Sequence, residues 1–463
     1  MRLTAAIVSA RAAAALSRGL RRGGGTALPG LVAERIDPDI IRTLASKLGH
    51  GSVLVTGTNG KTTTARLVRN VCEEAGLRVV ANSEGSNMMR GVAAALAGAA
   101  DWDGRMRGRK RRIGVFEVDE ATMPIVARAV NPRAVLFSNL FRDQLDRYGE
   151  VETVAALWRK AVRDFPADLT LAINADDPAV ASLSDAAVGT VILYGVEDTS
   201  QAGDALEHAA DARWCYACGA ELAYTTVFYG HLGHWRCPGC GRARPEPDVT
   251  VSSVTSQDGG MLVKLTIPDG EINVRIPLAG LYNAYNVAAA AALAVALGLE
   301  RDVIERGLAR FTAGFGRQER LAIDGREVQV ILAKNPAGVN QVIRIITADP
   351  GSKHLAIFLN DGLADGRDIS WIWDVDFEKL GEVSTLVVGG ERSWDMALRL
   401  KYAGLGDHPH VEDDTVAALR ESISATPEGG TLYVIPTYTA MLQVRNILGR
   451  WARRGAFWEG DRS

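Results

Sequence analysis

The feature that most constrains how this chain can fold is a glycine-containing loop at residues 56–64, which reads TGTNGKTTT. It follows a β-branched run at 52–56 and precedes apolar residues at helical spacing over 65–71. In a strand-loop-helix unit of this kind, backbone N–H groups and the helix N-terminus face a phosphate. The ammonium of Lys61 then meets the β- and γ-phosphate oxygens, and the Thr62 hydroxyl can ligate magnesium. The residues expected to contact the nucleotide are Gly57, Thr58, Asn59, Gly60, Lys61, Thr62 and Thr63.

Short β-branched runs alternate with helical stretches from residue 51 onward, which predicts βα units around a mostly parallel sheet. The first series of strands is expected at 52–56, 113–118, 134–139, 169–174 and 190–195. A second series, at 328–332, 354–360, 385–390 and 431–436, predicts a second doubly wound unit. We therefore expect three parts: a short helical segment at 1–50, a central nucleotide-binding α/β domain at 51–316, and a C-terminal Rossmann-like α/β domain at 317–463.

Composition excludes several classes of protein. The chain has 52 basic and 55 acidic residues and a net charge of -3, which gives no reason to expect nucleic acid as a partner. No run approaches the roughly 18 apolar residues that a membrane span needs. Arginines at 11, 18, 21 and 22 interrupt the Ala-rich N-terminal stretch, so it does not read as a secretory signal. We expect a cytoplasmic protein.

Four of the five cysteines form two CxxC pairs within an apparent insertion at about 212–245. Eighteen residues separate the pairs, and a glycine follows each pair, which is the spacing of a zinc ribbon. Four thiolates leave no open coordination position, so the expected ion is structural. We expect His231 and His234 at the surface rather than among the ligands. The expected zinc ligands are Cys215, Cys218, Cys237 and Cys240.

The loop sequence GTNGKT resembles that of the Mur ligases and the similar folylpolyglutamate synthases. These enzymes use ATP and Mg²⁺ to phosphorylate a carboxylate, and an amine then attacks the acyl phosphate. The resemblance implies a Mur ligase central ATPase domain in which Lys61 and Glu117 serve the reaction and Glu117 binds magnesium together with Thr62. The segment 138–149 resembles the family's Asn...Asp-His-x-Asp motif, with Gln144 in place of histidine. The resemblance further implies that Asn283 and Asn286 hold the adenine and that Arg317 reaches the nucleotide phosphates.

Within that family, the chain resembles the MurT group through its inserted ribbon and the segment NDGLADGRDISWIWDVDFE at 360–378. The resemblance implies ATP-dependent amidation of the α-carboxylate of D-glutamate in the lipid II stem peptide, giving D-isoglutamine at the inner face of the cytoplasmic membrane. It also implies a separate GatD-type glutaminase subunit that supplies ammonia. Asp368 or Asp365 is then expected to orient a histidine of that partner. The alternative for these carboxylates is a helix N-cap before 370–377.

Other interpretations remain open from the sequence. A single-chain Mur-type or folylpolyglutamate synthase-like ligase would take an amino acid instead of ammonia. A non-enzymatic ATP-dependent switch would use the ribbon to bind protein or nucleic acid. Lys160 lies near the spacing of a carbamoylated lysine that some Mur ligases use as a magnesium ligand. The basic run at 105–112 is either a solvated loop or a contact to lipid pyrophosphate or to the anionic membrane leaflet.

Overall fold

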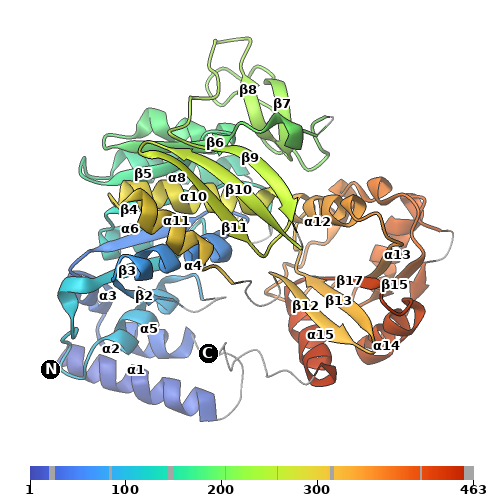
Figure 1. Cartoon of the computed structure of the whole chain (residues 1–463). Coiled ribbons are helices and arrows are strands. Elements are labelled where there is room, and N and C mark those ends of the chain that lie inside the picture. The colour runs from blue at the N-terminus through green and yellow to red at the C-terminus, as the bar shows by residue number, and fades with distance from the viewer. Residues whose placement is uncertain are drawn as a thin grey trace.

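The computed structural model describes residues 1–19, 27–82, 86–143, 151–203, 205–257, 259–312, 317–406 and 409–452. Its centre is a nine-stranded sheet with the order β11-β10-β9-β6-β5-β4-β1-β3-β2 (Figure 1). The strands from β9 to β2 pair in parallel, and β10 and β11 extend the sheet through antiparallel pairs. The strands are β1 (Ser52–Thr56), β2 (Arg78–Ala81), β3 (Arg112–Glu117), β4 (Ala134–Phe137), β5 (Thr170–Asn174), β6 (Val191–Val196), β9 (Val249–Gln257), β10 (Gly260–Ile267) and β11 (Gly270–Ile276).

Helices cover both faces of this sheet because its strands are apolar on both sides. Val53 and Val55 of β1 belong to one core, with α4, α10 and α11, while Leu54 belongs to the other, with α3, α5, α6 and α8. The alternation follows the two-residue period of a strand. The helices are α3 (Ile40–Ala45), α4 (Lys61–Glu74), α5 (Met89–Ala99), α6 (Met123–Val130), α8 (Val151–Arg163), α9 (Pro178–Ala181), α10 (Leu281–Ala296) and α11 (Arg301–Ala309).

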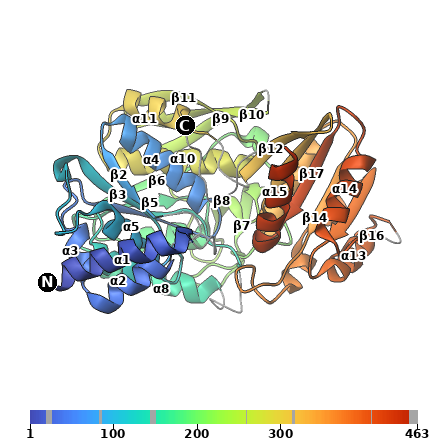
Figure 2. The same ribbon diagram turned by 90° about the horizontal axis from the view of Figure 1, so that it is seen from below.

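The N-terminal segment adds α1 (Arg2–Gly19) and α2 (Ala27–Ile36), which pack together beside α5 (Figure 2). Ala6, Ile7 and Ala10 of α1 are buried in this contact. Among the described residues, no helix is both long enough and apolar enough to cross a bilayer.

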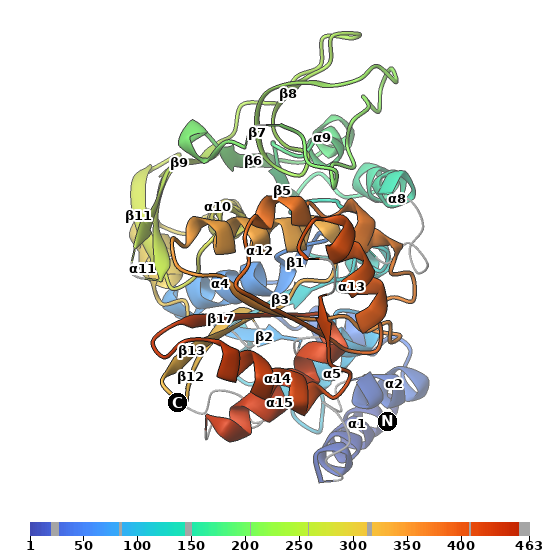
Figure 3. The same cartoon turned by 90° about the vertical axis from the view of Figure 1, so that its right-hand side faces the viewer.

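The C-terminal unit is a six-stranded sheet with the order β12-β13-β17-β14-β15-β16. Figure 3 shows α12 and α13 on one side of this sheet and α14 and α15 on the other. Its elements are β12 (Arg317–Ile323), β13 (Arg326–Ile331), α12 (Pro336–Ala348), β14 (His354–Phe358), β15 (Thr385–Gly389), α13 (Ser393–Tyr402), β16 (His410–Val411), α14 (Thr415–Ala425), β17 (Thr431–Pro436) and α15 (Tyr438–Trp451). Both predicted α/β series are therefore present.

The cysteine-rich insertion leaves the central sheet between β6 and β9, which pair with each other in parallel. It contains the antiparallel hairpin of β7 (Ala223–Tyr229) and β8 (Leu232–Arg236), which stands above the central sheet in Figure 1. Because the strands on either side of the insertion are neighbours, the ribbon is added to the sheet without interrupting it.

Candidate active site

The glycines of the phosphate loop allow a conformation that few other residues tolerate. Gly57 and Gly60 have φ angles of +139° and +83°, and α4 begins directly after Gly60. A Cβ at Gly57 would lie 1.9 Å from Ser138 Oγ, and one at Gly60 would lie 2.0 Å from Asn286 Oδ1. The loop therefore requires glycine at both positions, and its backbone leads into the N-terminus of α4, where N–H groups can face a phosphate.

Lys61 is buried at the start of α4 and is held by acidic neighbours. Its ammonium donates to the carbonyl of Gly57 and lies 3.2 Å from Glu120 Oε2. Burial alone would lower the pKa of Lys61, but the carboxylates of Glu120, Asp119 and Glu117 outweigh burial and raise this pKa. The lysine is thus a fixed cation at the mouth of the phosphate loop.

Thr62 and Glu117 come together although they are far apart in the sequence. The Thr62 hydroxyl donates to Glu117 Oε2 at 2.9 Å, and both residues are buried. Asn82 fixes the end of β3, because its side chain accepts from the backbone N–H of Glu117 at 3.0 Å and donates to the Glu117 carbonyl at 2.9 Å. A hydroxyl and a carboxylate side by side are the hard oxygen ligands that magnesium prefers.

Two asparagines hold the tip of the phosphate loop. Asn139 accepts from the Asn59 backbone N–H at 2.8 Å and donates to the Asn59 carbonyl at 3.0 Å. Asn335, the N-cap of α12, donates to the Asn59 side chain at 2.9 Å. The C-terminal unit therefore contacts the loop directly, a contact that no sequence pattern indicated.

Asn283 and Asn286 lie on the first turns of α10, behind the loop. Asn286 Oδ1 accepts from the Thr64 hydroxyl at 3.2 Å, and its amide donates to Asn283 Oδ1 at 3.1 Å. Asn283 donates in turn to the carbonyl of Ala279 at 2.8 Å. Both side chains are buried and bonded within the chain, so the structure gives them a part in supporting the loop in addition to the adenine contact that the resemblance implies.

Arg142 and Asp143 connect the central domain with the base of the ribbon and with the C-terminal unit. The guanidinium of Arg142 pairs with Asp211, at the base of the ribbon, and lies 3.1 Å from Asp374 of the C-terminal unit. Asp143 pairs with Lys334 and is among the carboxylates that raise the pKa of Lys61. These pairs link residues far apart in the chain, so sequence reasoning missed them.

Asp365 and Asp368, either of which was expected to face a partner, lie in different environments. Asp365 is buried, and its two carboxylate oxygens accept from the backbone N–H and the hydroxyl of Thr439. Asp368 is exposed and accepts from the backbone N–H of Ser370 at 2.8 Å, and this hydrogen bond lowers its pKa. The N-cap of the helix that follows, Ser370–Asp374, is Ile369, so Asp368 makes a local turn contact one residue before the cap. Its exposure leaves the carboxylate accessible to another subunit.

The four ribbon cysteines converge in space. Their sulfur atoms all lie within 4.8 Å of one another, and the cysteines are free thiols rather than disulfides. The backbone N–H groups of Gly219 and Gly241 donate to the carbonyls of Cys215 and Cys237 at 2.8 and 3.0 Å, so the two knuckles have the same turn. Four sulfurs at this separation fit a tetrahedral zinc ion.

The prediction that His231 lies at the surface was wrong. His231 is completely buried, and its Nε2 lies 3.3 Å from Asp177 Oδ2. Burial would lower the pKa of His231, but Asp177 and Asp211 outweigh it and raise this pKa. The histidine is an internal ion-pair partner at the base of the ribbon. It was misjudged because its partner, Asp177, comes from the central sheet.

The remaining predicted positions have simpler environments. Lys160 is exposed on α8, and Cys72 is buried in the core, where burial and then Glu73 raise the pKa of its thiol to about 12. Gln144 lies outside the described residues. So do residues 313–316, where the boundary between the central and C-terminal domains is expected, and the side chain of Arg317.

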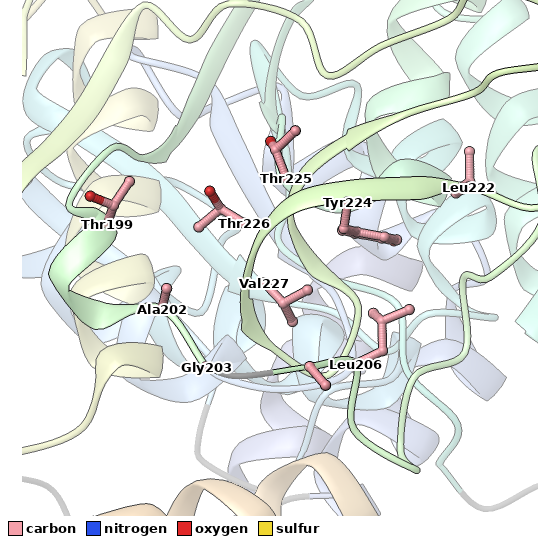
Figure 4. A pocket seen from close by; sticks show the side chains of 10 residues that line it. Thr199, Ala202, Gly203, Leu206, Leu222, Tyr224, Thr225, Thr226 and Val227 are labelled. Carbon is pink, nitrogen blue, oxygen red and sulfur yellow. The ribbon is translucent and has the colours of Figure 1, made fainter.

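A cavity of about 520 Å³ lies between β7 and the segment 199–206 (Figure 4). Its described lining offers hydroxyl and apolar groups without a carboxylate, an amine or a thiol, so it lacks the chemistry of the phosphate loop. The lining residues are Thr199, Ala202, Gly203, Ala205, Leu206, Leu222, Tyr224, Thr225, Thr226 and Val227.

Comparison with known proteins connects this geometry to a family. Residues 332–441 match the family model described as MurT ligase C-terminal, and residues 55–231 match the one described as Mur ligase middle domain. The MurT subunit of lipid II isoglutaminyl synthase (glutamine-hydrolyzing) from Staphylococcus aureus is 34% identical over 97% of this chain and 98% of its own length. The corresponding Streptococcus pneumoniae subunit is 33% identical over 92% of this chain and 93% of its own length. The pseudomurein peptide ligase type C of Methanothermus fervidus has a similar fold, with a TM-score of 0.65 and 23% identity over 86% of this chain and 78% of its own.

Proposed function

The chain belongs to the MurT family of Mur ligases, and we propose that it amidates the α-carboxylate of D-glutamate in the stem peptide of lipid II. The observation that carries the proposal is the grouping of Lys61, Thr62 and Glu117 at the mouth of the phosphate loop. The full-length similarity to subunits named for lipid II isoglutaminyl synthase supports the choice of substrate.

The reaction has two steps. The substrate carboxylate attacks the γ-phosphorus of ATP, so that an acyl phosphate forms and ADP leaves. Ammonia then attacks the acyl carbon, phosphate leaves, and a proton is lost to give the amide. Lys61 and the loop N–H groups stabilise the negative charge on the transferring phosphoryl group. Thr62 and Glu117 would hold Mg²⁺, which neutralises charge on the nucleotide phosphates when it is bound.

We propose that ammonia for the glutamine-dependent reaction comes from another protein. Glutamine hydrolysis by a thiol requires a reactive cysteine beside a base, but Cys72 is buried with a pKa of about 12. The other cysteines form the ribbon cluster, where we propose that four thiolates hold a structural zinc ion. We propose a GatD-type glutaminase as the partner. Asp368 would orient its catalytic histidine, since Asp368 is exposed while Asp365 is bonded internally.

The substrate is anchored to a lipid, so we also propose that the protein works at the inner face of the cytoplasmic membrane. The lipid-bearing substrate would be reached from the aqueous side.

An amidation assay tests the proposal. The purified chain receives ATP, Mg²⁺ and lipid II with either ammonium chloride or glutamine, each with and without the glutaminase, and the stem peptide is analysed by mass spectrometry. We expect ammonium to support conversion of the acid to the amide without the partner, and glutamine to support it only with the partner. Asp368→Asn should abolish the glutamine reaction and leave the ammonium reaction intact. Consumption of a free amino acid instead of ammonia would refute the proposal in favour of a single-chain ligase.

A further inference from the structure

The loop at residues 101–112, which we call the basic loop, carries many positively charged side chains. It contains six cationic side chains and two carboxylates, a local net charge of +4 in a chain whose net charge is -3. Asp101 and Asp103 pair with Arg107 and Arg105 at 3.0 and 3.3 Å. Both acidic residues are thereby neutralised within the loop, and a cationic excess remains.

That excess is carried by the short 3₁₀ helix Arg109–Arg111. All three side chains, Arg109, Lys110 and Arg111, are exposed. Within the described part of the chain they form no ion pair. Three adjacent cations on one turn, without compensating carboxylates, repel one another and gain from any anionic surface that approaches them.

The same loop exposes a tryptophan. Trp102 is 68% exposed, although indole is one of the largest apolar side chains. Tryptophan carries an apolar ring and a single N–H donor, and it is enriched where one end is apolar and the other wet, as at the boundary between lipid and water. An exposed tryptophan in the same loop as clustered cations therefore fits a phospholipid headgroup layer better than it fits water.

The basic loop is held in place. The backbone N–H groups of Gly49 and His50 donate to the carbonyls of Arg109 and Arg112 at 2.8 and 2.9 Å. Lys47 donates to the carbonyl of Gly104 at 2.7 Å. A Cβ on Gly104 would lie 2.6 Å from Leu3 Cδ2, so the loop packs closely against the beginning of α1. These contacts hold the basic loop beside the beginning of α1 and the segment 47–50.

The basic loop is also connected to the candidate active site. β3 begins at Arg112, at the end of the loop, and ends at Glu117. Five residue steps of a strand span ~17 Å. The active site thus lies within the reach of a headgroup and its peptide from a membrane that touches the loop, at the opposite end of the same strand.

We infer that the basic loop and Trp102 form a docking surface for an anionic phospholipid membrane. The inference rests on the proposed function insofar as lipid II is the substrate. Electrostatic attraction brings the surface to the bilayer, and Trp102 enters the headgroup layer. The substrate is then found by diffusion in two dimensions.

Vesicle cosedimentation of the full chain tests the surface. The wild type should bind phosphatidylglycerol-containing vesicles, bind pure phosphatidylcholine vesicles weakly, and lose binding as salt is raised. Replacement of Arg109, Lys110 and Arg111 by Gln should weaken binding by about fivefold per charge, or about a hundredfold together. Trp102→Ala should weaken binding even at low salt.

The matched control removes three exposed cations elsewhere, by Arg163→Gln, Arg236→Gln and Lys401→Gln. Equal loss of binding in this control and in the loop variant would overturn the inference, as would equal binding of the wild type to neutral and anionic vesicles. Binding to duplex DNA in preference to vesicles would also overturn it.

A water-soluble, short-chain analogue of lipid II separates this inference from the proposed function. Wild type and loop variant should amidate the analogue at equal rates, while the loop variant should be slower on lipid II embedded in anionic vesicles. Failure of the wild type on the analogue would count against the proposed function. Equal rates on embedded lipid II would overturn only the docking surface.

Discussion

Replacement of Gly60 by alanine tests whether the phosphate loop and α10 form one unit. Gly60 has a φ of +83°, and a Cβ there would lie 2.0 Å from Asn286 Oδ1. The backbone conformation costs an L-residue about 1 kcal/mol. Displacing Asn286 also breaks its hydrogen bonds with Thr64 and Asn283, each worth about 1 kcal/mol. We expect Gly60→Ala to lower the free energy of unfolding by about 3 kcal/mol in total.

Gly76 provides the control, because it lies just past the other end of α4. Its φ is +76°, and no atom lies within 4 Å of the position that a Cβ would occupy, so Gly76→Ala carries the backbone cost alone. Urea unfolding should therefore show a loss of about 1 kcal/mol for Gly76→Ala. Calorimetric titration with an ATP analogue should show unchanged affinity for Gly76→Ala. Gly60→Ala should weaken affinity about 30-fold if the roughly 2 kcal/mol lost at Asn286 is expressed in binding.

A double substitution tests whether the alanine at position 60 acts through Asn286. If the alanine acts by displacing Asn286, then adding Asn286→Ala to Gly60→Ala should cost little more, because the same hydrogen bonds are already lost. The loss in free energy of unfolding of the double variant would then be about 2 kcal/mol smaller than the sum of the two single losses. Additive effects, or equal nucleotide affinity for Gly60→Ala and Gly76→Ala, would show that the loop does not depend on α10.

Removing zinc with a chelator, or replacing Cys218 by Ser, should expose the ribbon to proteolysis and lower the melting temperature. Metal analysis should find one zinc ion per chain. A metal-free wild type with an unchanged melting temperature would contradict a structural role for the ion. Because the pKa of His231 is raised in the folded state, the His231–Asp177 pair should contribute its full stability below the unfolded pKa of about 6.5 and lose it as pH rises through the folded pKa. His231→Gln should therefore lower the free energy of unfolding by about 3 kcal/mol at low pH. The variant should also lack the decrease in melting temperature that the pair causes in the wild type as pH rises. A variant that keeps the wild-type dependence of melting temperature on pH would exclude the His231–Asp177 pair as the cause of that dependence. Arg142→Gln breaks the contacts with Asp211 and Asp374, and Asp374 lies in the segment 360–378 that also contains Asp368. The variant should therefore lower glutamine-dependent amidation about tenfold more than ammonium-dependent amidation, whereas equal losses would indicate a purely structural role.

The sequence by itself determined the features that are encoded within short segments. The strand, the glycine loop and the helix at 52–74 follow from local residue types, and so do both α/β series. The CxxC spacing likewise indicated a four-sulfur cluster before the chain was folded, because each knuckle is a single turn whose glycine sets its geometry. Glu117 was found through the family resemblance and its place at the end of a strand.

Only the tertiary structure decided which distant side chains meet. Lys334 and Asp143 are separated by 191 residues, and Arg142 and Asp374 come from different units. The sequence also left the burial of single side chains undetermined. His231 is internal although its local sequence resembles a surface loop. Asp365 and Asp368 are the same residue type, and they differ in burial and in hydrogen-bond partners because of the elements that pack beside them. The physical reason is that propensity and turn geometry act over a few residues. Ion pairing and burial depend on the packing of whole elements, which no local pattern specifies.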